Sequence, residues 1–567
     1  MKASLLNYPF ELVAPMAALG SVLLLPLGPL LIPRTYICFL LVYFTVFLYT
    51  QVSHLFKFYI TATKMKKNIR AWNQRSVTEE EEGDKINNVN VNKNSTRERI
   101  TSTDQDLEDM ETSLKLYDDS HFIHAFIVPN YAEPEALLRD TIKRIANHKN
   151  AQTNYVIILA MEAAELNHEA KANSLTEYFK DSFLHFIVTA HPADIPGEAR
   201  GKGSNVSFAA RHGCAQMIQH GIDRRRVVIT VSDSDSSIPE LYVKEVEKSF
   251  TQAEDPYFLL FAPPIFFSRN CFDVPAAVRM TDITWSAMVM SSLSNSRGLA
   301  FPCSTYSLSM VLAERVGYWD TDADAVGEDM HMMLKCFFKT DGLARCCPIF
   351  VPINLTNVQS DGYFSSMNAR FVQAKRHYNG VADLAYTLRN AFGVKDTIDA
   401  GHVFASKKTS IYAAPNFWLD KLVISIKVME AHLIPVTSGW LMFAAVPLMQ
   451  FILFPPSSFS AFVQPEDNPI LTSEFYSNLW NVVRVITVLL PFPLFGTLAV
   501  YEVLHRVVDR ELYHKSHTRT WRNMFDYISL PVAAWAFLTI PSTIASIKRL
   551  YKTNNEYIVA EKFFDEE

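Results

Sequence analysis

The sequence predicts an α/β domain with a mostly parallel sheet, inserted between two groups of membrane-spanning helices. Long uncharged runs lie near both ends of the 567-residue chain, and short apolar runs alternate with amphipathic stretches in its middle. The chain is 49% hydrophobic and 20% charged, which is apolar for a globular protein and still too polar for a bundle that lies wholly in a membrane. A protein with a membrane part and a soluble part is therefore expected.

Five uncharged segments are candidates for crossing a membrane. They cover residues 12–33, 35–53, 433–465, 485–501 and 527–547. Each has at least 17 residues, and a hydrocarbon core of about 30 Å needs a segment of about this length. No small-residue cleavage site follows the first run, so the first two segments are expected to form a helical hairpin rather than a signal peptide. The last segment contains Pro531 and Pro541 and is followed by basic residues, so an interfacial or re-entrant piece is the alternative there.

The distribution of lysine and arginine predicts the side of the membrane on which the middle region lies. Six basic residues lie between positions 57 and 75, whereas the stretch 466–474 holds three acidic residues and no basic one. Loops rich in lysine and arginine stay on the cytosolic side of a membrane. The middle region is therefore expected in the cytosol, at a plasma or Golgi membrane, with membrane lipid around the flanking helices.

These observations divide the chain into five parts. They are an N-terminal transmembrane hairpin, 1–56; a basic juxtamembrane segment and disordered linker, 57–119; a cytosolic α/β domain, 120–400; interfacial helices, 401–432; and a C-terminal transmembrane or re-entrant region, 433–567. The linker is expected to be disordered because it is polar and holds few large apolar residues. The interfacial helices are expected because apolar residues recur at helical spacing from 417 to 429, and a buried amphipathic helix is the alternative.

Strands and helices alternate through the first half of the α/β domain. The expected strands cover 122–131, 154–163, 184–190 and 226–232, and the expected helices cover 133–147 and 205–221. This rhythm predicts a largely parallel sheet with helices on both faces. Ligands of such sheets bind beyond the carboxyl ends of the strands.

Polar residues follow these strands where each one ends. Asp233 and Asp235 follow the fourth strand, and their oxygens can hold Mg²⁺ or Mn²⁺ bridging a diphosphate; an Asx-rich turn is the alternative. Glu162 ends the second strand, where a carboxylate can accept hydrogen bonds from a nucleobase or ribose. Lys202 follows the third strand in a glycine-rich turn, where a cation suits a phosphate, although an ordinary loop has the same composition.

Charge and cysteine content argue against other classes of protein. The net charge is −6, so nothing in the overall balance indicates a nucleic acid partner. The seven cysteines include no CxxC pair. They are expected to be reduced thiols in a cytosolic setting, rather than a disulfide framework or a zinc site.

Four spaced motifs resemble those of the membrane-embedded family 2 glycosyltransferases, the group that contains cellulose, chitin and hyaluronan synthases. They are VPNYAEP at the first strand, the Asp-x-Asp of SDSDS, the Glu-Asp of VGEDMHMMLKCFFKTDG, and QAKRHYNG. The resemblance covers about residues 122–378 and the flanking helices. It implies the GT-A fold for the α/β domain and a nucleotide-sugar donor.

The resemblance also implies a role for each matching residue. The catalytic candidates are Glu328 and Asp329, with Asp329 as the general base at the start of a helix, where the dipole favours a carboxylate. His377 stands at the family's tryptophan position, a departure that affects the acceptor site. The nucleotide- and sugar-binding candidates are Pro129, Tyr131, Glu133, Glu162, Lys202, Asp233, Gln373 and Arg376; the metal candidates are Asp233 and Asp235; and the acceptor-site candidates are Ser304, Thr305 and His377.

The resulting prediction is an inverting, metal-dependent hexosyltransferase that uses Mg²⁺ or Mn²⁺. It would move a sugar from a UDP-sugar to a growing polysaccharide and guide the product across the membrane. Two alternatives stay open: transfer of one sugar to a lipid acceptor, and a catalytically silent membrane scaffold that keeps the fold.

Overall fold

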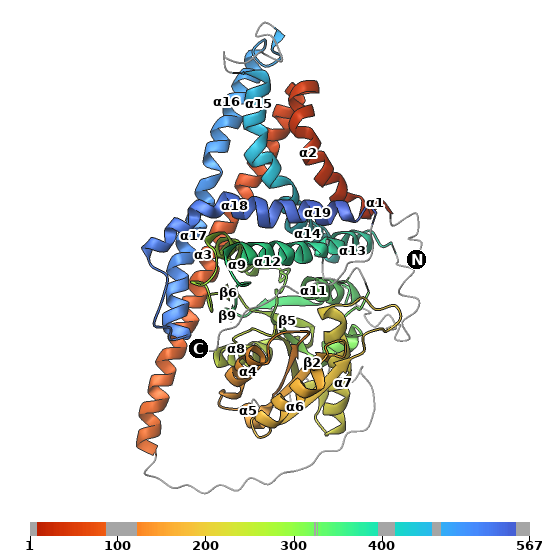
Figure 1. The fold of residues 1–567 in the computed structure, drawn as a ribbon, viewed down its shortest axis with the longest axis vertical. Helices are drawn as coiled ribbons and strands as arrows, with labels where there is room; N and C mark the ends of the chain where they lie inside the picture. Colours follow the sequence, from red (N-terminus) through yellow and green to blue (C-terminus); the bar gives the residue numbers. More distant parts are fainter. Residues whose placement is uncertain are drawn as a thin grey trace.

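A seven-stranded sheet forms the centre of the α/β domain (Figure 1). The structure is a computed structural model, and it describes residues 8–86, 122–322, 325, 327–394, 414, 416–455 and 467–551. The strand order is β3-β2-β1-β4-β7-β5-β8, and only β7 runs antiparallel to its neighbours. The strands are β1 Ile123–Pro129, β2 Tyr155–Glu162, β3 His185–His191, β4 Val227–Val231, β5 Leu259–Ala262, β7 Tyr306–Ser309 and β8 Arg345–Pro348. The predicted mostly parallel α/β sheet is confirmed.

Helices cover both faces of the sheet because its central strands are apolar on both sides. Every residue of β1 and β4 is buried. Alternate residues of these strands therefore belong to two separate cores, one beneath each layer of helices. One layer holds α7 (Lys202–Gln219), α10 (Met310–Arg315) and α11 (Glu328–Lys339), and the other holds α4 (Glu135–Ala146), α6 (His168–Tyr178) and α8 (Glu240–Gln252).

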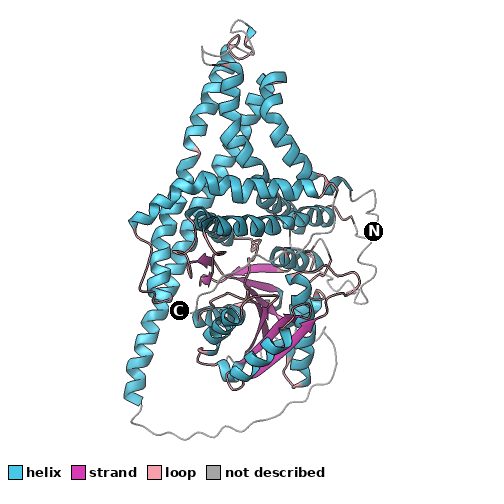
Figure 2. Ribbon diagram, viewed as in Figure 1, coloured by secondary structure: helices cyan, strands magenta, loops and turns pink. Residues whose placement is uncertain are grey.

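A layer of helices separates this sheet from the long apolar helices (Figure 2). It contains α9 (Ala276–Leu293), α12 (Tyr363–Tyr378) and α13 (Ala382–Ala391). A short parallel pair, β6 (Ile265–Phe267) with β9 (Ile353–Leu355), lies next to α9. The two ends of the chain are thus tied to the α/β domain through packed helices.

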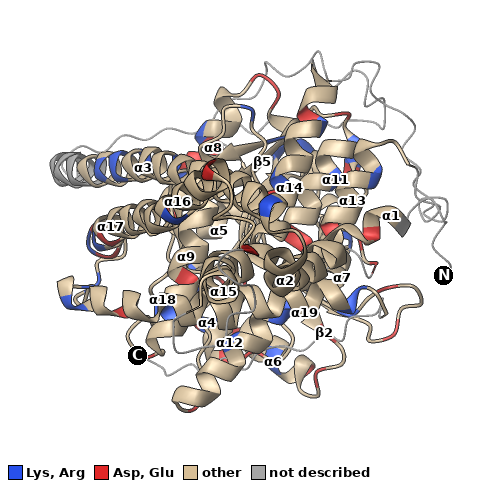
Figure 3. Ribbon diagram, turned by 90° about the horizontal axis from the view of Figure 1, so that it is seen from above, with Lys and Arg blue, Asp and Glu red and all other residues tan. Residues whose placement is uncertain are grey.

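Within the described residues, five helices are long and apolar enough to cross a membrane, and they cover Val13–Leu31, Pro33–Gln74, Phe417–Leu453, Glu474–Leu512 and Trp521–Lys548. The first four include α2 (Val13–Leu31), α3 (Pro33–Ile86), α14 (Phe417–Trp440) with α15 (Val446–Leu453), and α16 (Glu474–Leu489) with α17 (Pro491–Val507). Seen from above, α2 and α15 are almost uncharged, while lysine and arginine mark the far part of α3 (Figure 3). This pattern matches the basic segment expected after residue 56.

The last of the five candidates has a different orientation. It holds α18 (Leu530–Ala534) and α19 (Ile540–Lys548), and Figure 1 shows both lying across the direction of α2, α15 and α16. Helix α12 packs against α19. This arrangement favours the interfacial alternative for residues 527–547 over a crossing.

Two helices run through boundaries that the sequence division expected. The second candidate membrane segment is part of α3, which continues as far as Ile86, so the basic segment after residue 56 begins as helix. Helix α14 starts at Phe417 and continues through a π-turn into α15, so the chain is helical without a break across the expected boundary at residue 432. Most of the expected linker lies outside the described residues.

Candidate active site

Lys202 lies between two carboxylates at the carboxyl edge of the sheet. It begins α7, and its Nζ lies 2.8 Å from Oδ1 of Asp233 and 3.0 Å from Oε2 of Glu328. The ammonium also donates a hydrogen bond to the main-chain oxygen of Ser304 at 3.3 Å. Burial favours the neutral amine, but the two carboxylates outweigh it and raise the pKa of Lys202. Lys202 therefore stays protonated, and its ammonium connects Asp233, after β4, with Glu328, at the start of α11.

Glu328 and Asp329 make different contacts at the start of α11. Glu328 is buried and accepts a hydrogen bond of 2.7 Å from the Tyr306 hydroxyl. Asp329 is half-buried, and it accepts hydrogen bonds from the main-chain N–H groups of Ser304 at 2.9 Å and Met330 at 2.8 Å. Asp329 is thus the more accessible acid, which suits a base that must reach a substrate.

The support beneath Glu328 comes from residues that the sequence analysis missed. Burial raises the pKa of Glu328 to about 7, although Lys202 opposes the shift. The Tyr306 hydroxyl that binds Glu328 itself accepts a hydrogen bond of 2.6 Å from Nε1 of Trp319. The sequence around Tyr306, inside a strand, does not indicate that its hydroxyl will bind a glutamate on another element.

The two aspartates of the SDSDS motif lie in different surroundings. Asp233 is half-buried and faces Lys202, whereas Asp235 is only 2% exposed. Oδ2 of Asp235 accepts hydrogen bonds from the hydroxyl and the main-chain N–H of Thr356, which follows β9. Among the described residues, no group of three or more His, Cys, Asp or Glu could hold a metal ion. A cation held by these two acids would therefore need further ligands from a bound molecule, as a diphosphate provides.

Glu162 belongs to a chain of three side chains at the ends of β2 and β3. Nδ1 of His191, the last residue of β3, lies 3.1 Å from Glu162 Oε2, and its Nε2 lies 3.1 Å from Glu198 Oε2. Burial disfavours the charged imidazole, but the two carboxylates outweigh burial and raise its pKa. Sequence reasoning placed Glu162 at this edge and missed His191, although the parallel register pairs the two positions.

The turn after β1 holds the next three predicted nucleotide-binding residues. Pro129 ends β1 and is buried, whereas Tyr131 is 36% exposed. Oε2 of Glu133 accepts a hydrogen bond of 2.8 Å from the Tyr131 main-chain N–H. Glu133 thus shapes the turn, and Tyr131 offers its ring to the surface.

The predicted residues on α12 divide into a structural group and an exposed group. Gln373 Oε1 accepts a hydrogen bond of 2.6 Å from Arg370, which forms a buried ion pair of 2.9 Å with Asp282 on α9. These contacts hold α12 against α9. His377 is exposed and Arg376 is half-buried, one or more turns farther along the same helix.

Trp285 connects His377 with the segment Cys303–Ser304, which lies beside Asp329. The ring centroids of Trp285 and His377 are 6.3 Å apart, and Nε1 of Trp285 lies 3.5 Å from Sγ of Cys303. Cys303 precedes Ser304, whose N–H binds Asp329. The α9 tryptophan was not predicted, and it stands next to the histidine that replaces the family's tryptophan.

The two other acceptor-site candidates have different exposure. Ser304 is half-buried beside Asp329, whereas Thr305 is fully buried and its hydroxyl lies 3.0 Å from Oγ of Ser236. Ser304 can therefore face a substrate, and Thr305 holds the loop to the strand-end turn.

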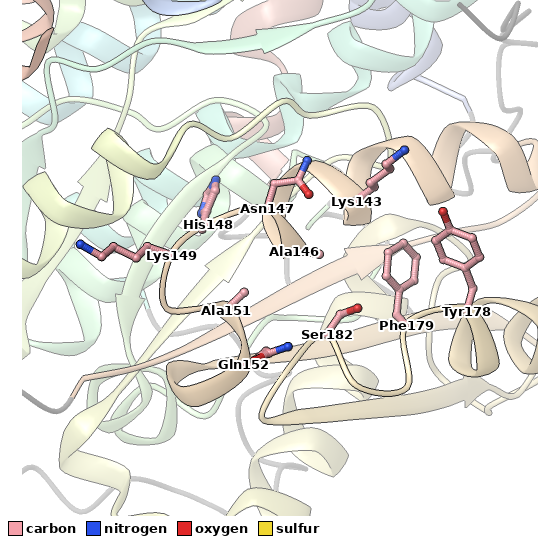
Figure 4. A pocket seen from close by; sticks show the side chains of 10 residues that line it. All are labelled: Lys143, Ala146, Asn147, His148, Lys149, Ala151, Gln152, Tyr178, Phe179 and Ser182. Carbon is pink, nitrogen blue, oxygen red and sulfur yellow. The ribbon is translucent and has the colours of Figure 1, made fainter. Parts of the chain in front are cut away.

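A surface pocket of about 310 Å³ lies at the opposite edge of the sheet (Figure 4). Its lining includes Asn147 and His148, between α4 and β2, and Phe179 and Ser182, which precede β3. These positions are at the amino ends of β2 and β3. The pocket is therefore separate from the site at the carboxyl edge.

Comparisons with known proteins find a family match over part of the chain. Residues 228–500 match the family model described as "Glycosyl transferase family group 2". The chain is similar in structure to a mannosyltransferase from Pyrobaculum calidifontis in complex with GDP-Man and Mn²⁺, with 16% identity, 70% of this chain and 90% of that chain covered, and a TM-score of 0.37. It is also similar to glucosyl-3-phosphoglycerate synthase from Mycobacterium tuberculosis in complex with Mn²⁺, UDP and glucosyl-3-phosphoglycerate, with 13% identity, 53% and 88% covered, and a TM-score of 0.28. No curated protein matches the chain.

The family match over residues 228–500 and the sheet topology together indicate a glycosyltransferase with a GT-A-like fold. The two structural likenesses are too distant to carry an argument about the substrate. The matched residues include both aspartates of SDSDS, Asp329 and Arg376.

Proposed function

We propose that this enzyme transfers a sugar, with inversion, from a UDP-sugar to a hydroxyl group held beside its membrane helices. The observation that carries the proposal is that Nζ of Lys202 lies within 3.0 Å of carboxylate oxygens of both Asp233 and Glu328. Asp329 is next to Glu328 at the start of α11. Tyr131 and Glu162 would flank the nucleoside at the same edge. The α/β domain would lie in the cytosol, at a plasma or Golgi membrane.

Asp329 is the proposed general base. Its carboxylate would take the proton of the acceptor hydroxyl as that oxygen bonds to the anomeric carbon of the donor sugar. The bond from this carbon to the diphosphate breaks at the same time, and the nucleoside diphosphate leaves. The Ser304 and Met330 N–H groups fix the carboxylate in place, which aligns the base before the acceptor arrives.

The diphosphate would be held by Lys202 together with Asp233 and Asp235. The two carboxylates provide hard oxygen donors suited to Mg²⁺ or Mn²⁺. A bound cation supplies Lewis-acid stabilisation of the departing diphosphate. Lys202 adds a fixed positive charge at the same place, because Asp233 and Glu328 keep it protonated.

Two acceptors are candidates, and a different observation favours each. A growing polysaccharide is the first, because Gln373 and Arg376 match the signature of the polymer synthases. A lipid is the second, because α2, α3, α15 and α16 share an apolar core that includes Leu25, Phe44, Met449 and Trp480. A packed apolar core between these helices is an unfavourable path for a polar polymer, which favours the lipid acceptor.

The deciding experiment is a panel of UDP- and GDP-sugars, each with Mg²⁺ or Mn²⁺, given to membranes that contain the protein. Transfer from a UDP-sugar is expected, and the radiolabelled product is then sized. A long water-soluble product supports the polysaccharide, and a short chloroform-soluble product supports the lipid acceptor. Absence of transfer and hydrolysis with every donor would instead support the silent scaffold.

Trp285 is expected to contribute to acceptor binding together with His377. Stacking on an aromatic ring contributes about 0.5–1.5 kcal/mol, so Trp285→Ala should raise the KM for the acceptor about 2- to 10-fold. Hydrolysis of the donor in water should be unchanged, since the Trp285 ring contacts His377 and Cys303 and is not part of the Lys202–Asp233 pair. Initial rates at varied acceptor concentration measure the effect.

Trp418→Ala is the matched control, because Trp418 is exposed at the start of α14. An unchanged acceptor KM in Trp285→Ala would contradict the role of this ring. Trp285→Phe should lie between the wild type and the alanine variant.

A further inference from the structure

A buried histidine follows Asp329 on α11 and has no part in the chemistry described above. His331 is 3% exposed. Its Nδ1 lies 2.6 Å from Oδ1 of Asp383, and its Nε2 lies 3.1 Å from Oδ2 of Asp320. A ring with a carboxylate at each nitrogen is expected to donate from both, as only the imidazolium can.

The charges around His331 are balanced. Lys335, one turn farther along α11, lies 2.6 Å from Oδ1 of Asp320, so two cations face two carboxylates. The Tyr386 ring, on α13, completes the enclosure at a centroid distance of 4.5 Å from the imidazole. Burial disfavours the charged ring, but Asp383 and Asp320 outweigh burial and raise the pKa of His331 to about 10.

These contacts join three parts of the molecule at the start of α11. Asp320 directly follows Trp319, the residue that binds Tyr306 beneath Glu328. Asp383 lies on α13, which packs against α14, the helix that leads into the membrane. The backbone before the acid pair passes close to Asp383 as well, since a Cβ at Gly327 would lie 3.1 Å from its Oδ2.

We propose that His331 is a positioning residue that ties the first turn of α11 to Asp320 and to Asp383 on α13. It thereby holds Asp329 at a fixed place relative to the acceptor, which approaches from the membrane helices. This inference rests on the proposed function of Asp329. Lys202 keeps Asp233 and the Ser304 main-chain oxygen as partners outside α11, so the donor should stay bound even where the contact of Lys202 with Glu328 shifts.

The test is His331→Asn in the full-length enzyme, purified in detergent. A misplacement of about 1 Å can cost about 100-fold in rate, so kcat for transfer should fall about 10- to 100-fold, while UDP affinity and donor KM stay at the wild-type values. His212→Asn is the matched control, because His212 is an exposed histidine on α7 that contacts the carbonyl and the ring of Phe208, one turn earlier on the same helix. A wild-type kcat per folded enzyme, or a parallel loss of UDP affinity, would overturn the proposal.

Two further measurements separate positioning from mere stability. Asp383→Asn keeps the volume and one acceptor oxygen, so it should fold and show a lowered kcat with unchanged UDP affinity, to a smaller degree than His331→Asn.

The melting temperature is the second measurement. Because the pKa is raised from 6.5 to about 10, the stabilisation is full below pH 6.5 and is lost as the pH rises toward 10; this loss should be smaller in His331→Asn. If the wild type transfers no sugar, the proposed function fails and this inference with it. If the wild type transfers sugar and the His331 and Asp383 variants have the same kcat, the inference alone fails.

Discussion

Asp329→Asn is expected to lower the rate of sugar transfer about 10²- to 10⁴-fold, the range that a general base contributes. The asparagine keeps the size of the side chain and can still accept the Ser304 N–H, so the loop should stay in place. It cannot take a proton from the acceptor hydroxyl. UDP affinity should be unchanged, because Lys202 and the two strand-end aspartates are untouched. Transfer rates and UDP titrations on the purified enzyme measure the two effects.

Asp181→Asn provides the matched control for this substitution, since Asp181 is an exposed aspartate before β3. Its rate should equal that of the wild type. Wild-type transfer by Asp329→Asn would show that another group is the base. Glu328 would be the next candidate, but its Tyr306 and Lys202 contacts occupy both of its oxygens.

The first four strands could be predicted from the sequence because each is an apolar run that ends at a turn. Their parallel direction follows from the alternation of strands and helices, and the carboxyl-edge rule then places Glu162, Lys202 and Asp233 together. The later part of the sheet could not be predicted in the same way. Strands β5, β7 and β8 have four residues each, too few for a period to show, and the antiparallel insertion of β7 depends on tertiary packing.

The acids of the site could be predicted, but most of their partners could not. A carboxylate at a strand end or a helix start has a local signature, whereas its partner is chosen by the folded chain. His191 meets Glu162 from 29 residues away, and His331 meets Asp383 from 52 residues away. Resemblance to a family points to the residues that share its motif, and Trp285 lies outside every motif. Its contact with His377 follows only from the packing of α12 against α9.

Asp235→Asn is expected to abolish the response of the enzyme to a divalent cation and to lower transfer about 10³-fold or more. The Lewis-acid contribution of a bound metal is several kcal/mol, and each 1.36 kcal/mol corresponds to about tenfold in rate. The asparagine can keep the Thr356 hydrogen bonds, so the turn after β4 should hold its shape while the negative charge is lost. Transfer rates over a titration of Mn²⁺, and UDP affinity with Mn²⁺ or with EDTA, measure the effect.

Cation-dependent UDP binding in Asp329→Asn and in Asp235→Asn distinguishes loss of the base from loss of the cation site. In the wild type and in Asp329→Asn, Mn²⁺ should strengthen UDP binding and EDTA should reverse the gain. In Asp235→Asn, the two conditions should give the same weak affinity, because Asp233 alone cannot share a cation with the diphosphate. Asp255→Asn, an exposed aspartate before β5, controls for the loss of one negative charge. Cation-dependent UDP binding in Asp235→Asn would contradict the assignment and leave Lys202 as the main partner of the diphosphate. Buried Asp235 would then have a structural role only, in which it holds Thr356, after β9, against the turn after β4.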